Sequence, residues 1–101
     1  MIKHLVFWRL KDSAHGNSKR ENALEIQRLL SGLHGKIPGL LTIEVGLDLS
    51  QTPNSSDVAL YSEFESEAAL LAYQSHPLHQ AIVPFVAEAA AERRVVDYPT
   101  P

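Results

Sequence analysis

Residues 2–10 alternate in the two-residue period of a β-strand, and both faces of this segment carry bulky apolar side chains. The first face holds His4, Val6 and Trp8, and the second holds Leu5 and Phe7. A strand with one solvated face has polar residues on that face, whereas this segment has an apolar pair there. The pattern therefore predicts a central strand that is covered on both sides.

A helix is predicted next, because Ser18 stands three residues before Glu21, which is the spacing of a capping box. The apolar residues after it repeat every three or four positions, as a stripe that faces a sheet does. They are Ala23, Ile26, Leu30 and Leu33. Gly35 is expected to stop this helix in a left-handed conformation. Pro38 and Gly39 then fit the two central positions of a type II turn.

Alternation indicates three further strands, two before the second helical region and one near the end of the chain. Their expected ranges are 41–47, 58–64 and 95–98. The segment between the first two, residues 50–57, is rich in serine and contains Pro53. It is too polar to bury, so we predict an exposed connection there.

The second helical region is predicted to begin after Ser66, whose hydroxyl can cap the first helical turn. Proline is tolerated at the first position of a helix, so we expect one helix to end at His76 and another to begin at Pro77. Pro84 is expected to kink or restart that helix. The alanine-rich sequence after it predicts continued helix to about Glu92.

The predicted order of strand, helix, strand, strand, helix and strand is that of the split βαβ, or ferredoxin-like, fold. This is an α+β architecture in which helices cover one face of a four-stranded antiparallel sheet. The other face is expected to carry Leu5, Phe7, Ala59, Tyr61, Val96 and Tyr98. Exposed apolar areas of this kind usually mark an interface, so we predict a homodimer in which the two open sheet faces pack together. The alternative is that the C-terminal tail or loop 49–57 covers the face.

Composition and charge exclude several classes of protein. With 101 residues, the chain is expected to form a single domain over 1–101. A net charge of −3 without a basic cluster argues against a nucleic-acid partner. The longest apolar run is far shorter than the ~20 residues of a membrane span, and the first residues lack the pattern of an export signal. We therefore expect no membrane partner and a cytoplasmic location.

Several short stretches resemble the stress-responsive A/B barrel family, also called Dabb, for dimeric α+β barrel. The stretches are 1–6, 36–40, 43–46, 64–66, 73–79 and 95–98. The Tyr-x-x-His-Pro-x-His pattern of 73–79 is the most specific of them. The resemblance covers nearly the whole chain and implies a ferredoxin-like protomer whose sheet packs on that of a second copy. It also implies a link to stress, which some plant relatives have, and a distant similarity to olivetolic acid cyclase, a polyketide-cyclising member.

Tyr73, His76 and His79 follow one another at intervals of three, which places neighbouring members near one face of a continuous helix. A histidine titrates near neutral pH and can take a proton from a weakly acidic carbon, and a tyrosine hydroxyl can polarise a carbonyl. The resemblance to the cyclase implies that His79 is a general base assisted by Tyr73. It also implies that His4, on the first strand, belongs to the same pocket.

Between the sheet and the helices we expect an apolar pocket that binds a small hydrophobic or aromatic molecule without a cofactor. Its expected lining is Val6, Trp8, Leu30, Val58, Leu60, Ile82 and Val95. By the resemblance, Leu30 and Val58 stand where the cyclase has a tyrosine and a histidine, so the cyclase activity itself is not carried over. His76 and His79 are too few ligands for a zinc site, so we expect no metal.

Structural alternatives remain open for the same side chains. His76 can cap the helix that begins at Pro77, and His4 can be a core histidine bonded to a backbone carbonyl. Tyr73 can simply pack its ring in the core. Under that interpretation the protein is a non-catalytic stress-response module. Heme-degrading and quinol-oxidising monooxygenases share the dimeric barrel architecture, and no residue of this chain singles them out.

Overall fold

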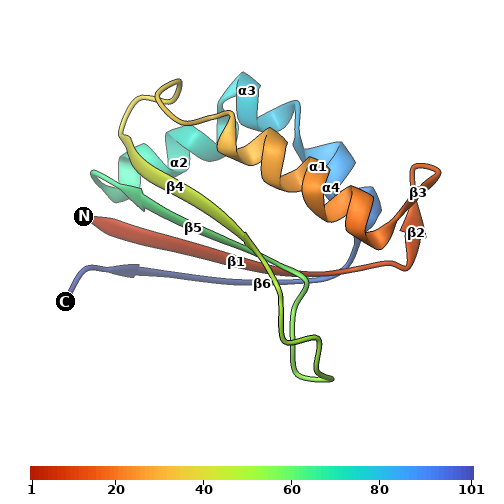
Figure 1. The fold of residues 1–101 in the computed structure, drawn as a ribbon. Coiled ribbons are helices and arrows are strands. Elements are labelled where there is room, and N and C mark those ends of the chain that lie inside the picture. Colours follow the sequence, from red (N-terminus) through yellow and green to blue (C-terminus); the bar gives the residue numbers. More distant parts are fainter.

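The computed structural model describes residues 1–101, and it places all four helices on one face of a single four-stranded sheet (Figure 1). The sheet order is β4-β5-β1-β6 with every pair antiparallel. The strands of this sheet are β1 (Ile2–Leu10), β4 (Leu40–Leu47), β5 (Val58–Phe64) and β6 (Ala90–Pro99). The helices are α1 (Lys19–Ser31), α2 (Glu67–Ser75), α3 (Pro77–Gln80) and α4 (Val83–Ala89). The predicted ferredoxin-like α+β fold is therefore confirmed.

Strand β1 is central, as its two apolar faces predicted. It pairs with β5 on one side and with β6 on the other. His4, Val6 and Trp8 are buried beneath the helices, while Leu5 and Phe7 lie half-buried on the open face. The alternation of the sequence therefore assigns each side chain of this strand to its observed face.

Helix α1 begins where the capping box predicts. The Ser18 hydroxyl accepts from the backbone N–H of Glu21 at 3.2 Å, and the Glu21 carboxylate accepts from the backbone N–H of Ser18 at 2.9 Å. The expected stop at Gly35 is wrong, because the helix ends at Ser31 and Gly32 is its C-cap. Gly35 does have a positive φ of 77°, but in the turn that follows the helix.

The turn before β4 has the conformation predicted for Pro38 and Gly39. Gly39 has a φ of +81°, and the backbone N–H of Leu40 donates to the carbonyl of Ile37 at 3.2 Å, which closes the turn. The strand starts at Leu40 and contains an irregularity before Thr42. The alternation of residues 41–47 predicts Leu41 on the same apolar face as Ile43 and Val45, but Leu41 is the extra residue at this irregularity and is 46 % exposed.

The second helical region is divided at the predicted points. Ser66 caps α2 by accepting from the N–H of Ala69 at 3.1 Å. His76 caps α3 through its Nδ1, which accepts from the N–H of Leu78 at 3.1 Å. Pro77 opens α3, and Pro84 lies in the first turn of α4.

The end of this region differs from the prediction, because α4 stops at Ala89 and β6 already begins at Ala90. Residues 90–99 pair with the whole length of β1. Those ladder hydrogen bonds outweigh the helix propensity of the alanines, which is a weak preference in the presence of tertiary pairing.

A small hairpin between β1 and α1 is not predicted by the pattern. It consists of β2 (Ser13–Ala14) and β3 (Asn17–Ser18), joined by His15 and Gly16 at φ values of 56° and 72°. Positive φ at both central residues is the requirement of a tight hairpin turn. The His15 ring stacks on that of Phe85, with centroids 4.2 Å apart, and so attaches the hairpin to α4.

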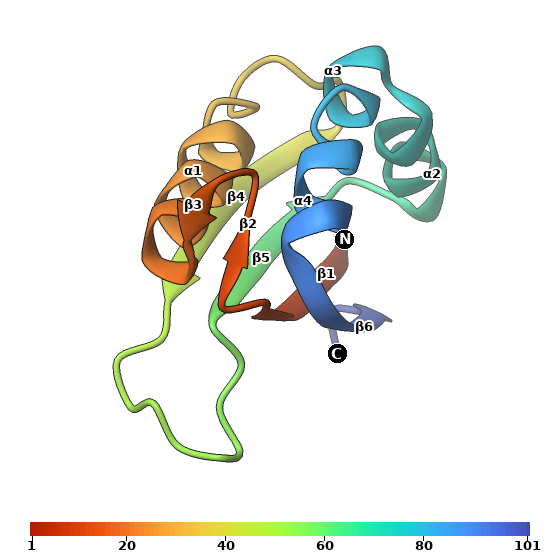
Figure 2. The same ribbon diagram turned by 90° about the vertical axis from the view of Figure 1, so that its right-hand side faces the viewer.

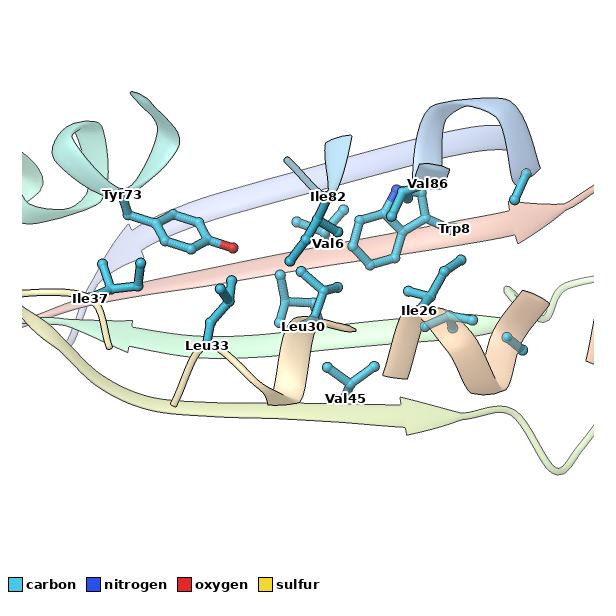
Figure 3. Packing of buried hydrophobic residues seen from close by; sticks show 14 of the residues in the cluster. Val6, Trp8, Ile26, Leu30, Leu33, Ile37, Val45, Tyr73, Ile82 and Val86 are labelled. Atoms are coloured by element: carbon cyan, nitrogen blue, oxygen red, sulfur yellow. The ribbon is translucent and has the colours of Figure 1, made fainter. Parts of the chain in front are cut away.

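The hydrophobic core fills the space between the sheet and the helices (Figure 3). Figure 2 shows α1 over one half of the sheet and the α2–α4 segment over the other half. The fully buried side chains of this core include Val6, Ile26, Val58, Phe64 and Tyr73. None of the helices combines the length and the hydropathy that crossing a membrane requires.

Candidate functional site

A cavity of about 390 Å³ lies between the sheet and the helices. Eleven of its 15 lining residues are hydrophobic, so an occupant would make mostly apolar contacts. The lining includes Val6, Trp8, Leu30, Leu60 and Ile82 of the expected set, and Val83, Val86, Ala87, Ala90 and Ala91 beside them. The four other lining residues are His4, His79, Glu92 and Arg93, and Tyr73, the eleventh hydrophobic residue, adds a hydroxyl.

Two residues expected in the lining lie outside it. Val58 is 1 % exposed and is covered by the core at the far end of β5, where it pairs with Trp8 and Leu47. Val95 pairs with Val6 across the two strands, and both point to the face that the helices cover. Strand β6 is at the edge of the sheet, however, and Val95 is 41 % exposed.

Tyr73 places a buried hydroxyl at the cavity. The residue comes from α2 and is 1 % exposed, and its hydroxyl oxygen has no hydrogen-bond partner. Figure 3 shows the hydroxyl pointing toward Ile82 and Val6, both of which line the cavity. Burial raises the pKa of Tyr73 to about 12, so the phenol stays protonated at neutral pH and can donate a hydrogen bond.

His79 comes from α3 and lies beside Tyr73, with ring centroids 4.4 Å apart. Its Nδ1 is 3.2 Å from the carbonyl oxygen of Gln74. A carbonyl only accepts, so Nδ1 carries the proton and Nε2 of the neutral ring is left as a proton acceptor. Burial lowers the pKa of His79, against the effect of the Gln74 hydrogen bond, and the charges of His4 and Arg93 lower it further. The ring is therefore mainly neutral at pH 7 and can act as a base.

His4 is held by a carboxylate on the neighbouring strand. Asp97 lies directly opposite His4 on β6, and the His4 Nδ1 pairs with the Asp97 Oδ1. His4 is 3 % exposed, and its carbonyl accepts from the Ser62 hydroxyl at 3.0 Å. The His4 and Tyr73 ring centroids are 6.2 Å apart. The alternative of a bond from the imidazole to a backbone carbonyl is not what the structure shows.

The structure thus brings His4, Tyr73 and His79 to one cavity, from β1, α2 and α3. Together they offer a phenolic donor and an imidazole acceptor within an apolar enclosure. His76 lies apart from them as the cap of α3.

Sequence reasoning missed two charged residues of this region, Asp97 and Arg93. Both lie on the part of β6 that faces the helices, opposite His4 and Trp8. Arg93 lies between the end of a predicted helix and the start of a predicted strand, so the sequence pattern did not predict which side of the sheet its side chain faces. Given that the strand begins at Ala90, the two-residue alternation places Arg93, Val95 and Asp97 on one face, which is the face that the helices cover.

Comparison with known proteins decides the family. The model of the stress responsive A/B barrel domain matches residues 2–100. The chain belongs to this family. An uncharacterised protein of Streptomyces coelicolor is 33 % identical over 81 residues, which are 80 % of this chain and 81 % of that protein.

Solved structures agree with this A/B barrel assignment. A dimeric protein of unknown function with a ferredoxin-like fold from Bacteroides fragilis is 32 % identical, with a TM-score of 0.84 over 98 % of this chain and 95 % of that one. A hydroxynitrile lyase from Passiflora edulis has a TM-score of 0.82 at 20 % identity, covering 99 % of this chain and 93 % of that one. That second likeness shows the A/B barrel protomer fold alone.

Proposed function

We propose that this A/B barrel protein binds a small, mostly apolar molecule that carries a hydrogen-bond acceptor. The observation that carries the proposal is the Tyr73 hydroxyl, which is buried at the cavity without a partner. Leaving such a group unsatisfied costs about 1–3 kcal/mol, and a ligand carbonyl or hydroxyl oxygen beside it removes that cost. The bound state therefore supplies the hydrogen bond that the empty protein lacks.

The size of the cavity limits the ligand class. A volume of about 390 Å³ lies at the lower end of the ~300–1,000 Å³ typical of small-molecule pockets. One or two aromatic rings, or an aliphatic chain of similar volume, fit such a space. The aliphatic walls from Leu30, Leu60 and Ile82 favour a ring or chain over a sugar or a nucleotide.

Binding can be followed through Trp8, which is the one tryptophan of the chain and lines the cavity. The test compares 2-acetylnaphthalene with 2-ethylnaphthalene, which has nearly the same shape and no acceptor. We expect the ketone to bind about fivefold more tightly, and this preference to vanish in Tyr73→Phe. Failure of both compounds to change Trp8 fluorescence, confirmed by calorimetry, would refute the proposal.

A second candidate function is proton-transfer catalysis, with His79 as general base. It is favoured by one specific observation, the Nδ1 hydrogen bond to Gln74 that leaves Nε2 as the proton acceptor of a neutral ring. A ligand carbonyl held by Tyr73 would have its α-carbon acidified next to that base. In a linear polyketide, the carbanion left when His79 removes the α-proton attacks a second carbonyl carbon and closes a ring. The alkoxide formed at that carbonyl takes the proton back from His79, and His4 orients the chain. The hydroxynitrile lyase that shares the fold is a lyase on the same scaffold, which makes this class reasonable for the cavity.

Deuterium exchange tests this second function with the same ketone. The methyl protons of 2-acetylnaphthalene are α to the carbonyl, and their exchange in D2O is measured by NMR. We expect the protein to accelerate the exchange over buffer and His79→Gln to abolish the acceleration while 2-acetylnaphthalene still binds. If the ketone binds but its methyl protons exchange only at the rate measured in buffer, the catalytic function is refuted and the binding function stands.

We further propose that two copies pack through the open sheet face. Leu5 and Phe7 are half-buried there, and Val96 and Tyr98 are 47 % and 37 % exposed. The C-terminal tail and loop 49–57 therefore leave much of the face uncovered in the single chain. The Bacteroides fragilis neighbour is described as dimeric, which supports the same assembly here.

A further inference from the structure

One cation of the cavity lining has no acidic partner. Arg93 lies on β6 opposite Trp8, on the face that the helices cover, and it lines the cavity. Arg9, Arg28 and Arg94 each bond a glutamate carboxylate, whereas Arg93 bonds none. A guanidinium presents five donors in a planar fork, so this side chain has its full hydrogen-bonding capacity available.

The acids nearest to Arg93 are engaged elsewhere. Glu92 also lines the cavity, but its carboxylate accepts from Arg9 at 3.2 Å and from Arg94 at 2.9 Å. Asp97 pairs with His4. The positive charge of Arg93 is therefore not neutralised by a neighbour. It acts inside the cavity, because it contributes to the lowered pKa of His79 and opposes the rise that burial causes in the pKa of Tyr73.

Arg93 and Tyr73 mark two ends of the cavity with different chemistry. Arg93 is exposed and stands at the solvent side, while Tyr73 is 1 % exposed and stands at the buried side. The wall between them is largely apolar. A ligand that satisfies both ends has an anionic group at one end, an apolar body, and a neutral oxygen at the other.

We infer that the cavity selects an aromatic or alkyl carboxylate whose carboxylate bonds to Arg93 and whose distal oxygen accepts from Tyr73. The inference rests on the proposed binding function and names its ligand class. A carboxylate suits the site better than a phosphate does. One guanidinium matches one unit of charge in bidentate geometry, and no second lysine or arginine lines the cavity to match a dianion.

The test uses two probes of nearly the same shape, the anion 6-hydroxy-2-naphthoate and the neutral 6-hydroxy-2-naphthamide, each measured by calorimetry. We expect the wild-type protein to bind the carboxylate about five- to tenfold more tightly than the amide. Arg93→Gln should reduce that ratio to about one, chiefly by weakening the carboxylate. Arg94→Gln is the matched control, because it removes the same charge one residue away, on the opposite face of the strand, and should keep the wild-type ratio.

The outcomes separate this inference from the proposed function. If both probes bind and their ratio is the same in wild type and in Arg93→Gln, the inference is overturned and the binding function stands. If the ratio falls equally in Arg93→Gln and Arg94→Gln, the preference is a general field effect, and the inference is likewise overturned. If neither probe binds, both the binding function and the inference fail.

Discussion

The rings of Tyr73 and His79 lie 4.4 Å apart across the break between α2 and α3. In a continuous α-helix, residues six positions apart lie about 120° apart around the helix axis and therefore point in different directions. The break at Pro77, which His76 caps, is what brings the two side chains together. The interval of three alone is therefore not the reason for their proximity, and an unbroken helix would separate them.

Replacing Tyr73 by phenylalanine separates a ligand-binding role from a packing role. The hydroxyl has no partner, so Tyr73→Phe should leave the free energy of unfolding unchanged or raise it by up to about 1 kcal/mol. Urea unfolding measures this. Tyr61→Phe is the control, because the Tyr61 hydroxyl donates to Glu63 and its loss should destabilise. A clear loss of stability in Tyr73→Phe would show that the hydroxyl has a structural partner.

The lowered pKa of His79 predicts a pH dependence of stability. Its folded-state pKa lies below the ordinary value of 6.5. As the pH falls through 6.5, the His79 side chain therefore binds a proton more readily in the unfolded chain than in the folded protein. The contribution of His79 to stability is therefore complete above about pH 6.5 and declines toward lower pH.

Unfolding free energies measured between pH 5 and 8 should thus decline less on acidification in His79→Gln than in the wild type. His34→Gln, at an exposed histidine, should keep the wild-type slope. A histidine NMR titration that assigns His79 a pKa above 6.5 would contradict the prediction.

The pair of His4 and Asp97 should stabilise the junction of β1 and β6. Asp97→Asn replaces a charged acceptor with a neutral one, and we expect a loss of about 1 kcal/mol in the free energy of unfolding. The control Asp12→Asn, at a fully exposed carboxylate, should change it by less than about 0.5 kcal/mol. A double-mutant cycle with His4→Gln measures the coupling, and additive effects would mean that the pair contributes nothing.

A charge on the open sheet face should prevent association. Phe7→Glu is expected to shift sedimentation at micromolar concentration from dimer to monomer, because the carboxylate would be buried against the second sheet without a partner. Leu71→Glu is the control, since Leu71 is 65 % exposed on α2, on the helical side of the molecule. A wild-type protein that sediments as a monomer would remove the basis for the paired sheets.

The turn at Gly39 should tolerate no other residue. Gly39 has a φ of +81°, and a Cβ there would lie 2.6 Å from that of Ala69. Gly39→Ala is expected to destabilise by about 2–4 kcal/mol, from the left-handed strain and the clash together. Gly35→Ala, at a φ of +77° in open space, should cost only the strain, about 1 kcal/mol. Equal losses in urea unfolding would show that Ala69 moves aside freely.

The candidate site was only partly readable from the chain. Tyr73 and His79 were singled out because their residue types carry chemistry and because the stretch 73–79 resembles the family pattern. The role of Arg93 was not visible, because a residue assigned to the end of a helix has no defined face. Its position became clear only with the pairing of β6 on β1.

By itself the sequence determined the features that depend on near neighbours. The strands at 2–10 and 58–64 and the caps at Ser18, Ser66 and His76 follow from alternation and from bonds that span two or three residues. The tertiary structure alone decided where helix gives way to strand at Ala90 and which acid orients His4. Both result from the pairing of β1 with β6, at the two ends of the chain. The energy of that pairing depends on residues far apart in sequence, so a short stretch of sequence cannot predict it.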